Sequence, residues 1–353
     1  MFSKRFAELK PYVPGEQPRD RTYIKLNANE NPYPPSPEVS RAIREFDASQ
    51  LRLYPDPDST QLRAAIARML GKGVTPEMIL AGNGSDEVLS FVFYTFFDSD
   101  APLHFPEHTY SFYPVYAGYY SIPYKKIPLA VDYSINTDAM LEGNSSGIIF
   151  ANPNAPTGIY MPLDNIRYML ERYPSDRVVV VDEAYIDFGG ESAITLLKDY
   201  KNLVIIRTFS KSYCFAGVRL GFAVAHPELT AALYTTKNSF NHFPVDLLAQ
   251  KMGIAACGDP EYYRKINGEI MQTREEFTAG LRQAGWDVLP SMANFVLVRK
   301  SGLEGRSIYE HIKQNGILVR HFDIPVIKDF VRISVGTPGD MAKLFGIMKA
   351  LQA

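Results

Sequence analysis

The sequence predicts an α/β protein with a large domain, built on a mostly parallel mixed sheet, and a smaller α+β domain at its C-terminal end. In the central part of the chain, short continuous apolar runs alternate with helical patterns, and runs that are apolar on both faces are typical of buried parallel strands. The length of 353 residues is sufficient for two domains. We expect an N-terminal arm over residues 1–30, a large domain over 31–240 and a small domain over 241–353, with the arm packing on the small domain or on a partner subunit.

Four central segments predict the strands of the large sheet. They are GIIFA (147–151), RVVVVD (177–182), NLVIIRT (202–208) and LGFAVA (220–225). The segment MILAGNGSDEVLSFVFYTFF (78–97) predicts a strand, a glycine turn and a helix in succession. Helical patterns over residues 57–71 and 162–173 fit between strands, which is the alternation expected of a layered α/β domain.

After about residue 240 the pattern changes. Two helical segments cover residues 245–256 and 261–285, and strands follow in ANFVLV (293–298), ILVR (317–320) and VRISV (331–335) before a closing helix. In the second helix, apolar residues recur at helical spacing and predict one buried face: Tyr262, Ile266, Ile270, Phe277 and Leu281.

Composition excludes several classes of function. The 37 basic and 39 acidic residues nearly balance, so nothing favours binding to nucleic acid or to a membrane surface. Cys214 and Cys257 are the only cysteines, and the six histidines are scattered, so no metal site is expected. The N-terminal segment lacks the apolar core of a signal peptide, and no run reaches the length of a membrane helix. We therefore expect a cytoplasmic protein.

Lys211, in TFSKSYCFAGVRLGF, is the first candidate for covalent chemistry. It follows the strand 202–208, at the edge where an α/β sheet presents side chains to a ligand. A lone lysine here is ordinarily a surface residue. Thr208 and Ser210 add hydroxyls, however, and Arg219 adds a permanent cation, a set that can bind a phosphate and leave one amine free to react.

Asp182 is the second candidate, because it ends the strand RVVVVD after four valines. A buried carboxylate requires a cationic partner, although a solvated strand-end aspartate or a turn cap is the alternative. Tyr185 lies three residues later. A carboxylate for a protonated pyridine, with a phenol beside it, is the environment that an electron-sink cofactor requires.

Three further segments offer binding groups. Gly84, Ser85 and Asp86 open a helix after a strand, so their amides are expected to face an anion, with the Asp86 carboxylate turned away; a plain capped turn is the alternative. The loop NPNAPTG (152–158) is stiff enough to hold an amide side chain, although such clusters are usually turns. Arg332 alternates into a strand among apolar neighbours and predicts a carboxylate ligand, unless it faces water at a sheet edge.

An ordered series of short motifs resembles the class I/II pyridoxal-phosphate aminotransferases, which have the fold-type I transferase fold. Along the chain, these motifs are NANENP, YPDP, GNGSDE, HTYSFY, NPNAPTG, VDEAY, TFSK, AGVRLGF and FVRISVG. The histidinol-phosphate aminotransferase branch fits best. The resemblance runs from residue 11 to the last helix. The ordered series is specific for the fold and for pyridoxal 5′-phosphate as cofactor, and less specific for the substrate.

The resemblance implies roles for individual residues. Lys211 matches the Schiff-base lysine, Asp182 the partner of the ring nitrogen, and Tyr185 the phenol on the 3′ oxygen. The 5′-phosphate would be held by Gly84, Ser85, Asp86, Thr208, Ser210 and Arg219, with Tyr110 stacked on the ring. Tyr54 resembles the tyrosine that reaches a neighbouring subunit's phosphate, which implies a homodimer with a shared active site. For the substrate, Arg332 matches the clamp on the α-carboxylate of glutamate, and Tyr12, Asn27 and Arg320 fall at further substrate contacts.

The sequence departs from the family at one position. The family commonly has asparagine directly before P-T-G, where its amide bonds the 3′ oxygen, and here the residue is Ala155. Either Asn154 takes over this contact or Tyr185 makes it alone.

The resemblance implies a ping-pong transamination of histidinol phosphate with 2-oxoglutarate, giving imidazole-acetol phosphate and glutamate in histidine biosynthesis. An aromatic amino-acid aminotransferase and a phosphothreonine decarboxylase are alternatives within the same fold. A dinucleotide oxidoreductase would need a G-x-G-x-x-G turn, which is not found, and would leave Lys211 unexplained. A non-catalytic regulator on this fold would need an added DNA-binding module, for which the arm is too short.

Overall fold

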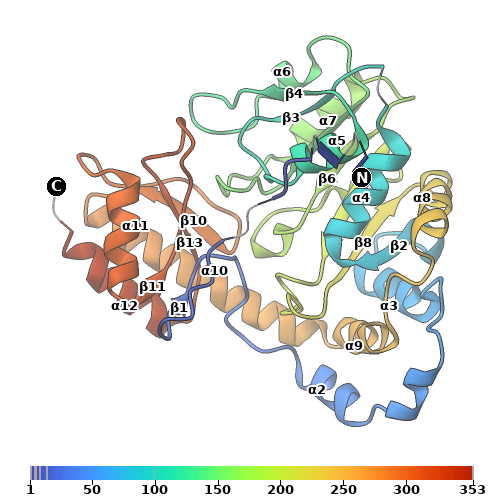
Figure 1. Ribbon diagram of the computed structural model, residues 1–353, viewed down its shortest axis with the longest axis horizontal. Helices are drawn as coiled ribbons and strands as arrows, with labels where there is room; N and C mark the ends of the chain where they lie inside the picture. The colour runs from blue at the N-terminus through green and yellow to red at the C-terminus, as the bar shows by residue number, and fades with distance from the viewer. Residues whose placement is uncertain (1, 4–5, 8, 13–14, 99, 352–353) are drawn as a thin grey trace.

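The computed structural model describes residues 2–3, 6–7, 9–12, 15–98 and 100–351. It consists of a large unit and a small unit that lie side by side (Figure 1), and the long helix α10 (Pro260–Gln283) extends from one to the other. The fold confirms the predicted α/β architecture, with a large mixed sheet and a separate antiparallel sheet in the small unit.

Seven strands within the described residues form the large sheet, in the order β2-β8-β7-β6-β5-β3-β4. The strand β8 pairs antiparallel with both of its neighbours, β2 and β7, and the other pairings are parallel. The bounds are β2 Ile79–Asn83, β3 Leu103–Pro106, β4 Tyr124–Ile127, β5 Gly147–Ala151, β6 Val179–Asp182, β7 Leu203–Thr208 and β8 Leu220–Ala225.

Two apolar cores cover the two faces of this sheet, because its central strands are buried on both sides. One core gathers residues of α2 (Pro37–Arg44), α3 (Thr60–Leu70), α7 (Leu163–Arg172) and α9 (Leu247–Cys257) against one face. The other gathers residues of α4 (Gly84–Phe96), α5 (Tyr113–Tyr120) and α8 (Pro227–Phe240) against the opposite face. Shorter helices complete the large unit: α6 Thr137–Leu141, η1 Ala48–Arg52, η2 Pro76–Met78, η3 Ile186–Phe188 and η4 Ala193–Leu196.

The small unit has its own antiparallel sheet, in the order β12-β13-β10-β9, and its own core. The arm joins this unit, because β1 pairs in parallel with β11 and Leu26 lies in the small core. The bounds are β1 Ile24–Lys25, β9 Asp287–Val288, β10 Phe295–Arg299, α11 Gly305–Gln314, β11 Ile317–Leu318, β12 Arg320–His321, β13 Val331–Ser334 and α12 Pro338–Lys349.

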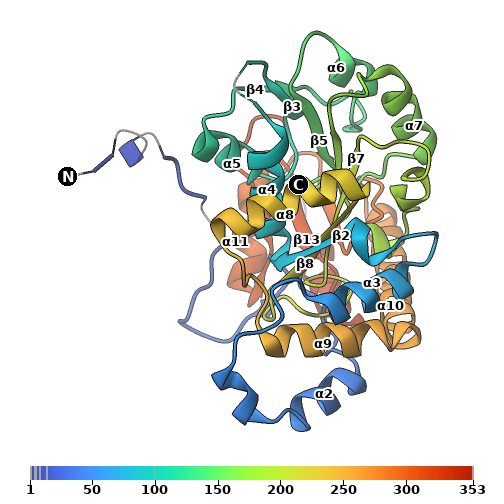
Figure 2. The ribbon, with the colours of Figure 1, turned by 90° about the vertical axis from the view of Figure 1, so that its right-hand side faces the viewer.

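The change from one core to the other falls inside α10. Ile266 packs in the large-unit core, whereas Phe277 and Leu281 pack in the small-unit core. The helix α9, which follows the expected domain boundary at residue 240, packs on α2 and α3 at the end of the large unit seen in Figure 2. On α10, Tyr263 is buried in place of the expected Tyr262, whose hydroxyl donates to the Pro34 carbonyl at 2.8 Å.

The sheet brings polar residues together at one edge. The parallel strands β5, β6 and β7 end at Ala151, Asp182 and Thr208, so the loops that follow them open on the same side. In such sheets the carboxyl ends of the strands are the usual place for a ligand. Among the described residues, no helix is both long enough and apolar enough to cross a membrane.

Candidate active site

Two adjoining cavities open at this edge of the large sheet, one of about 360 Å³ and one of about 110 Å³. Tyr110, Ala155, Tyr185 and Lys211 line both, so the two form one continuous site. The smaller cavity collects most of the side chains that the sequence assigned to the cofactor: Ser85, Asp86, Tyr110, Asp182, Tyr185, Thr208, Ser210, Lys211 and Arg219.

Lys211 lies where the two cavities meet, three residues after the end of β7. Its Nζ donates to the Ala28 carbonyl at 3.2 Å and lies 5.7 Å from the centre of the Tyr185 ring. Asn31 holds the lysine backbone, because its Nδ2 donates to the Lys211 carbonyl at 3.0 Å. The amine is therefore partly buried, oriented by the arm, and within reach of a ligand in either cavity.

Asp182 faces the floor of the smaller cavity. Its carboxylate is 4% exposed and accepts hydrogen bonds from the Tyr113 hydroxyl at 2.9 Å and the Ala184 amide at 3.2 Å. Burial raises the pKa of this carboxyl to about 6, and these two hydrogen bonds act in the opposite direction. Asp182 does cap the turn after β6, as the alternative interpretation had it, but it is buried rather than solvated.

Tyr185 has a partner that the sequence did not predict. Asn29, in NANENP, donates its Nδ2 to the Tyr185 hydroxyl at 3.0 Å. Asn29 is itself buried, and Ser334 of β13 donates to its Oδ1 at 3.1 Å. The phenol is therefore fixed by the arm and by the small unit together. No local pattern marks this contact, because it joins residues 156 positions apart.

The start of α4 and Arg219 form an anion cradle, which we define as residues 84–86, 208, 210 and 219. The helix begins at Gly84, so its first amides have no partner within the helix and face the cavity edge. Gly84 has φ +79°, and a Cβ there would come within 2.6 Å of an Arg219 guanidinium nitrogen. Arg219 itself has φ 61°, an uncommon backbone conformation for an arginine. The backbone is thus adapted to bring the guanidinium against the helix start.

From the sequence we expected the Asp86 carboxylate to turn away from the cradle. Instead, it lies against Arg219. It pairs with Arg219 at 3.1 Å and accepts a hydrogen bond from the Tyr110 hydroxyl at 2.7 Å. Burial, together with the Asp86 charge, raises the pKa of Tyr110 far above its ordinary value, so this phenol is a hydrogen-bond donor. A guanidinium without another anion nearby attracts the carboxylate, which explains the difference.

Asn154 lines neither cavity. Its Oδ1 accepts from Thr109 at 2.9 Å, and its Nδ2 donates to the His108 carbonyl at 2.9 Å and to Thr157 at 3.2 Å. Ala155, the next residue, lines both cavities instead. The amide side chain that does reach Tyr185 is that of Asn29.

The larger cavity holds two guanidiniums. Arg332 and Arg320 lie on neighbouring strands, directly paired in register, and each guanidinium is 5.4 Å from the centre of the Phe322 ring. Neither forms an ion pair within the described residues, and the buried Nε of Arg332 lacks a hydrogen-bond partner there. Burial lowers the pKa of Arg332, and the neighbouring Arg320 acts in the same direction. Two uncompensated positive charges in one cavity favour a ligand that carries more than one negative charge.

Residues of the arm close the larger cavity. Tyr12 lines it and packs on Phe112 with ring centres 5.2 Å apart. Asn27 lines it as well, donates its Nδ2 to the Glu16 carbonyl at 3.0 Å, and has a buried Oδ1 without a partner among the described residues. The structure thus brings Tyr12, Asn27, Arg320 and Arg332 together around one volume.

Tyr54 is another predicted cofactor residue that lines neither cavity. Its side chain is 83% exposed and stacks on Phe243 with ring centres 4.7 Å apart and planes at 9°. Within one chain, Tyr54 therefore has no contact with the site.

An ion-pair network that the sequence did not predict connects two of the loops that carry site residues. Arg207 of β7 pairs with Asp187 at 2.5 Å and Glu183 at 3.5 Å, and Ser212, which follows Lys211, donates to Asp187 at 2.5 Å. Burial raises the pKa of Glu183 to about 7, although Arg207 acts in the opposite direction. The network ties the turn after Asp182 to the turn that carries Lys211.

Comparison with known proteins identifies related chains over almost the whole length. Residues 21–347 match the family model described as aminotransferase class I and II. A histidinol-phosphate aminotransferase from Syntrophus aciditrophicus is 54% identical, with 99% of this chain and 98% of that protein aligned. Histidinol-phosphate aminotransferase 2 from Dechloromonas aromatica is 47% identical, again with 99% and 98% aligned.

Solved structures give the same result. The crystal structure of histidinol-phosphate aminotransferase from Sinorhizobium meliloti, in complex with pyridoxal-5′-phosphate, superposes with a TM-score of 0.89 at 26% identity, covering 99% of this chain and 98% of that one. An aspartate aminotransferase from Thermus thermophilus superposes with a TM-score of 0.84 at 18% identity and shares the fold.

Proposed function

Because the chain belongs to the class I and II aminotransferases, we propose that it exchanges an amino group between histidinol phosphate and 2-oxoglutarate, forming imidazole-acetol phosphate and glutamate in histidine biosynthesis. The relatives that carry this name are 54% and 47% identical over nearly the full length. The observation that carries the substrate assignment is that two guanidiniums, those of Arg320 and Arg332, share one cavity and form no ion pair with any of the described residues.

Pyridoxal 5′-phosphate is the cofactor, and the residues around the smaller cavity fit it. When bound, it supplies a carbonyl carbon that receives the amino group and a ring that takes up the electron pair left by proton removal. The cradle fits the phosphate, because it joins unpaired helix amides to a guanidinium and requires glycine at position 84. The buried Asp182 fits a protonated ring nitrogen, because its carboxylate forms no ion pair within the described part of the chain and a cation beside it would offset the cost of burial.

Lys211 is proposed as the group that binds the cofactor covalently and then moves the proton. Its Nζ lies where the two cavities meet, so one amine can face the cofactor and the substrate Cα. A neutral amine is required to take a proton from carbon. Tyr185, held by Asn29, is proposed to donate to the ring oxygen of the cofactor. Asn29 therefore orients Tyr185, and in this proposal Tyr185 makes the contact with the ring oxygen without the amide that is missing at Ala155.

Arg320 and Arg332 are proposed to bind the anionic groups of both substrates. Glutamate and 2-oxoglutarate each have two carboxylates, and histidinol phosphate has a phosphate but no carboxylate, so a two-guanidinium cavity serves all of them. Phenylalanine has a single carboxylate and would leave one guanidinium uncompensated. Tyr12 and Asn27 are proposed to close the cavity around the bound amino substrate.

An activity screen tests this proposal. Purified enzyme loaded with cofactor would be given 2-oxoglutarate and, separately, histidinol phosphate, phenylalanine, tyrosine or phosphothreonine. We expect the highest kcat/KM with histidinol phosphate, and Arg320→Leu should raise its KM more than that of phenylalanine. Turnover of phenylalanine with none of histidinol phosphate would identify an aromatic aminotransferase, and release of CO₂ from phosphothreonine would identify a decarboxylase.

We also propose that the working unit is a homodimer in which Tyr54 completes the cradle of the neighbouring subunit. The exposed position of Tyr54, outside both cavities of its own chain, supports this assignment. The exposed aromatic residues Phe2 and Phe6 at the start of the arm supply further apolar surface for a partner. Sedimentation should give twice the chain mass of 39.7 kDa; a monomer with full activity would contradict the proposal.

A cytoplasmic location is proposed from the state of the cysteines. Cys214 and Cys257 are both free thiols, as is usual in a reducing compartment. Fractionation of cells that produce the protein would test this location.

A further inference from the structure

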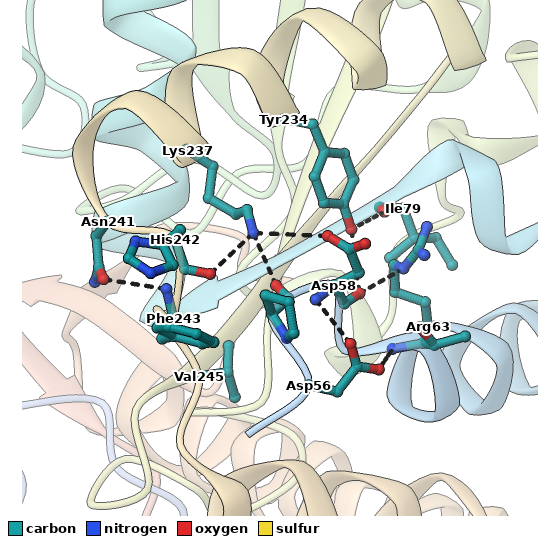
Figure 3. Close-up of polar contacts among 12 residues, drawn as sticks. Asp56, Asp58, Arg63, Ile79, Tyr234, Lys237, Asn241, His242, Phe243 and Val245 are labelled. Atoms are coloured by element: carbon teal, nitrogen blue, oxygen red, sulfur yellow. Dashed lines mark hydrogen bonds and ion pairs between the residues drawn. The ribbon is translucent and has the colours of Figure 1, made fainter. Parts of the chain in front are cut away.

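A buried lysine, Lys237, lines neither cavity, and Figure 3 shows its polar contacts. This lysine lies near the end of α8 and is 1% exposed. Its Nζ donates to the Pro57 carbonyl at 2.7 Å and to the His242 carbonyl at 3.2 Å, and lies 3.9 Å from the Asp58 carboxylate. Burial of a cation is costly unless its donors find partners inside the protein, and here two carbonyls, the Asp58 carboxylate and the Tyr234 ring, 5.2 Å from Nζ, supply them. Burial also lowers the pKa of Lys237, against the effect of Asp58 and Asp56.

A second buried donor repeats the same connection from another helix. Gln250 of α9 is 6% exposed, and its Nε2 donates to the Asp56 carbonyl and to the Val245 carbonyl, both at 3.0 Å. Lys237 and Gln250 thus each join one carbonyl of residues 56–57 to one carbonyl of residues 242–245. We call this pair the clamp.

The two segments that the clamp joins carry the stacked aromatic pair of Tyr54, which is exposed, and Phe243. Tyr54 precedes the clamped residues 56–57 in the segment YPDP, and its stacking partner Phe243 lies between the clamped residues 242 and 245. The segment is otherwise stiffened locally, because the Asp56 carboxylate accepts from the amides of Asp58 at 3.0 Å and Thr60 at 2.7 Å. Two segments nearly 190 residues apart in sequence therefore meet in a fixed relation, and the result on the surface is an oriented tyrosine ring.

We infer that Lys237 is a positioning residue for Tyr54, and that the clamp holds this ring ready for the neighbouring subunit's cofactor site. The inference rests on the proposed function, in which Tyr54 completes the partner's cradle. An exposed tyrosine loses conformational freedom when it binds a phosphate, and a ring that is already fixed loses less. In this inference, the Lys237 charge is buried because it orients Tyr54 for a contact with the neighbouring subunit.

A double-mutant cycle tests the inference with the full-length protein. The variants are Lys237→Met, Tyr54→Phe and the double variant, and the quantity is the dissociation constant of pyridoxal 5′-phosphate from titration of each apoenzyme. Loss of one hydrogen bond to a charged group corresponds to about tenfold weaker binding. We expect Tyr54→Phe and Lys237→Met each to weaken binding by up to about tenfold, and the double variant to be no weaker than Tyr54→Phe alone.

Two further variants separate positioning from general destabilisation. Gln250→Met removes the second half of the clamp and should weaken cofactor binding in the same direction, even if Lys237→Met does not fold. Asn202→Leu is the matched control, because its buried amide also donates to two backbone carbonyls, those of Pro174 and Arg177, but lines neither cavity. It should lower the melting temperature and leave the dissociation constant unchanged.

The outcomes distinguish this inference from the proposed function. Weaker binding in Tyr54→Phe with wild-type binding in both Lys237→Met and Gln250→Met would overturn the clamp and keep the shared site. Independent, additive losses in the double variant would also overturn it. Unchanged binding in Tyr54→Phe would overturn the shared site, and the inference with it. Faster amide hydrogen exchange over residues 53–58 in Lys237→Met, but not in Asn202→Leu, is expected alongside the loss in affinity.

Discussion

At the scale of single residues, the ionised carboxylate of Asp182 lowers the free energy of unfolding at neutral pH. Burial raises its pKa from 3.8 to about 6, so the folded state favours the protonated form more than the unfolded state does. The stabilisation that comes from protonating this carboxyl is therefore fully present below pH 3.8 and is lost as the pH rises through about 6. At neutral pH the carboxylate is ionised in a site that disfavours its charge, which prepares it for a cationic ligand.

Asp182→Asn should consequently stabilise the apoenzyme at high pH. The amide carries no charge and its oxygen can still accept from Tyr113, so we expect a gain of about 2 kcal/mol at pH 8 that shrinks toward pH 4. Urea unfolding of both apoproteins at pH 8 and pH 4.5 measures the difference. Asp199→Asn, at an exposed position, is the control and should show no such pH dependence. An equal gain at both pH values would contradict the explanation.

Between elements, the contact of β8 with the start of α4 depends on Gly221. A Cβ at this position would collide with the backbone nitrogen of Ser85, which belongs to the cradle. Gly221→Ala must therefore shift a backbone segment, because no flexible side chain is present to move aside.

We expect Gly221→Ala to lose about 1–3 kcal/mol of stability and to weaken binding of pyridoxal 5′-phosphate. Gly118→Ala in α5 is the matched control, since no atom lies within 4 Å of the added methyl group; it should be neutral or slightly stabilising. Chemical denaturation and cofactor titration of both variants provide the comparison. Wild-type affinity in Gly221→Ala would show that the cradle does not depend on this contact.

The network of Arg207, Glu183 and Asp187 connects the loops after β6 and β7. Burial acts to lower the pKa of Arg207, but Asp187 and Glu183 raise it further, so the guanidinium stays charged. Removing one member of a buried ion pair leaves the other charge uncompensated and costs about 3–5 kcal/mol.

Arg207→Met should accordingly be strongly destabilised, by about 3 kcal/mol, and the double variant with Glu183→Gln should recover part of this loss. Urea unfolding of the two variants, compared with Glu183→Gln alone, measures the coupling. Additive effects would mean that the 3.5 Å pair contributes nothing of its own.

The sequence predicted best those elements whose hydrophobic pattern does not depend on distant parts of the chain. GIIFA and LGFAVA coincide with β5 and β8 because each is buried on both faces and bounded by polar residues. The strand β4, Tyr124–Ile127, was missed because it lies at the sheet edge and its first three residues are exposed. The helix α5 was missed because its aromatic residues show no one-sided pattern.

The site was predictable where a side chain follows a strand or opens a helix, as Lys211, Asp182 and Gly84 do. Asn29, Tyr113 and Arg207 were not, because their roles depend on partners that only the folded chain brings near. The Asp86 carboxylate was misplaced for the same reason, since its position follows from Arg219 across 133 residues.

At the scale of the whole molecule, a shared site predicts complementation between an inactive variant and an impaired one. Lys211→Ala should be inactive, and Tyr54→Phe should be impaired at limiting cofactor. In a mixed dimer one site receives both changes and the other receives neither, so the second site is fully wild type. Mixing the two variants should restore up to a quarter of wild-type activity, since about half of the dimers are mixed and each has one intact site.

The activity of serial mixtures at fixed total protein checks this prediction, and Lys211→Ala mixed with wild type is the control for simple dilution. Activity that is merely the sum of the two separate proteins would show that each chain builds its own site.

The position of the arm has a practical consequence. Because Tyr12, Gly15 and Glu16 form part of the wall of the larger cavity, an affinity tag fused at the N-terminus would extend the same segment that lines this cavity. The other end of the described chain, after α12, lies on the side of the small unit that faces away from the large unit (Figure 1). Kinetic work should therefore use a tag at the C-terminus, or one that is cleaved from the N-terminus before assay.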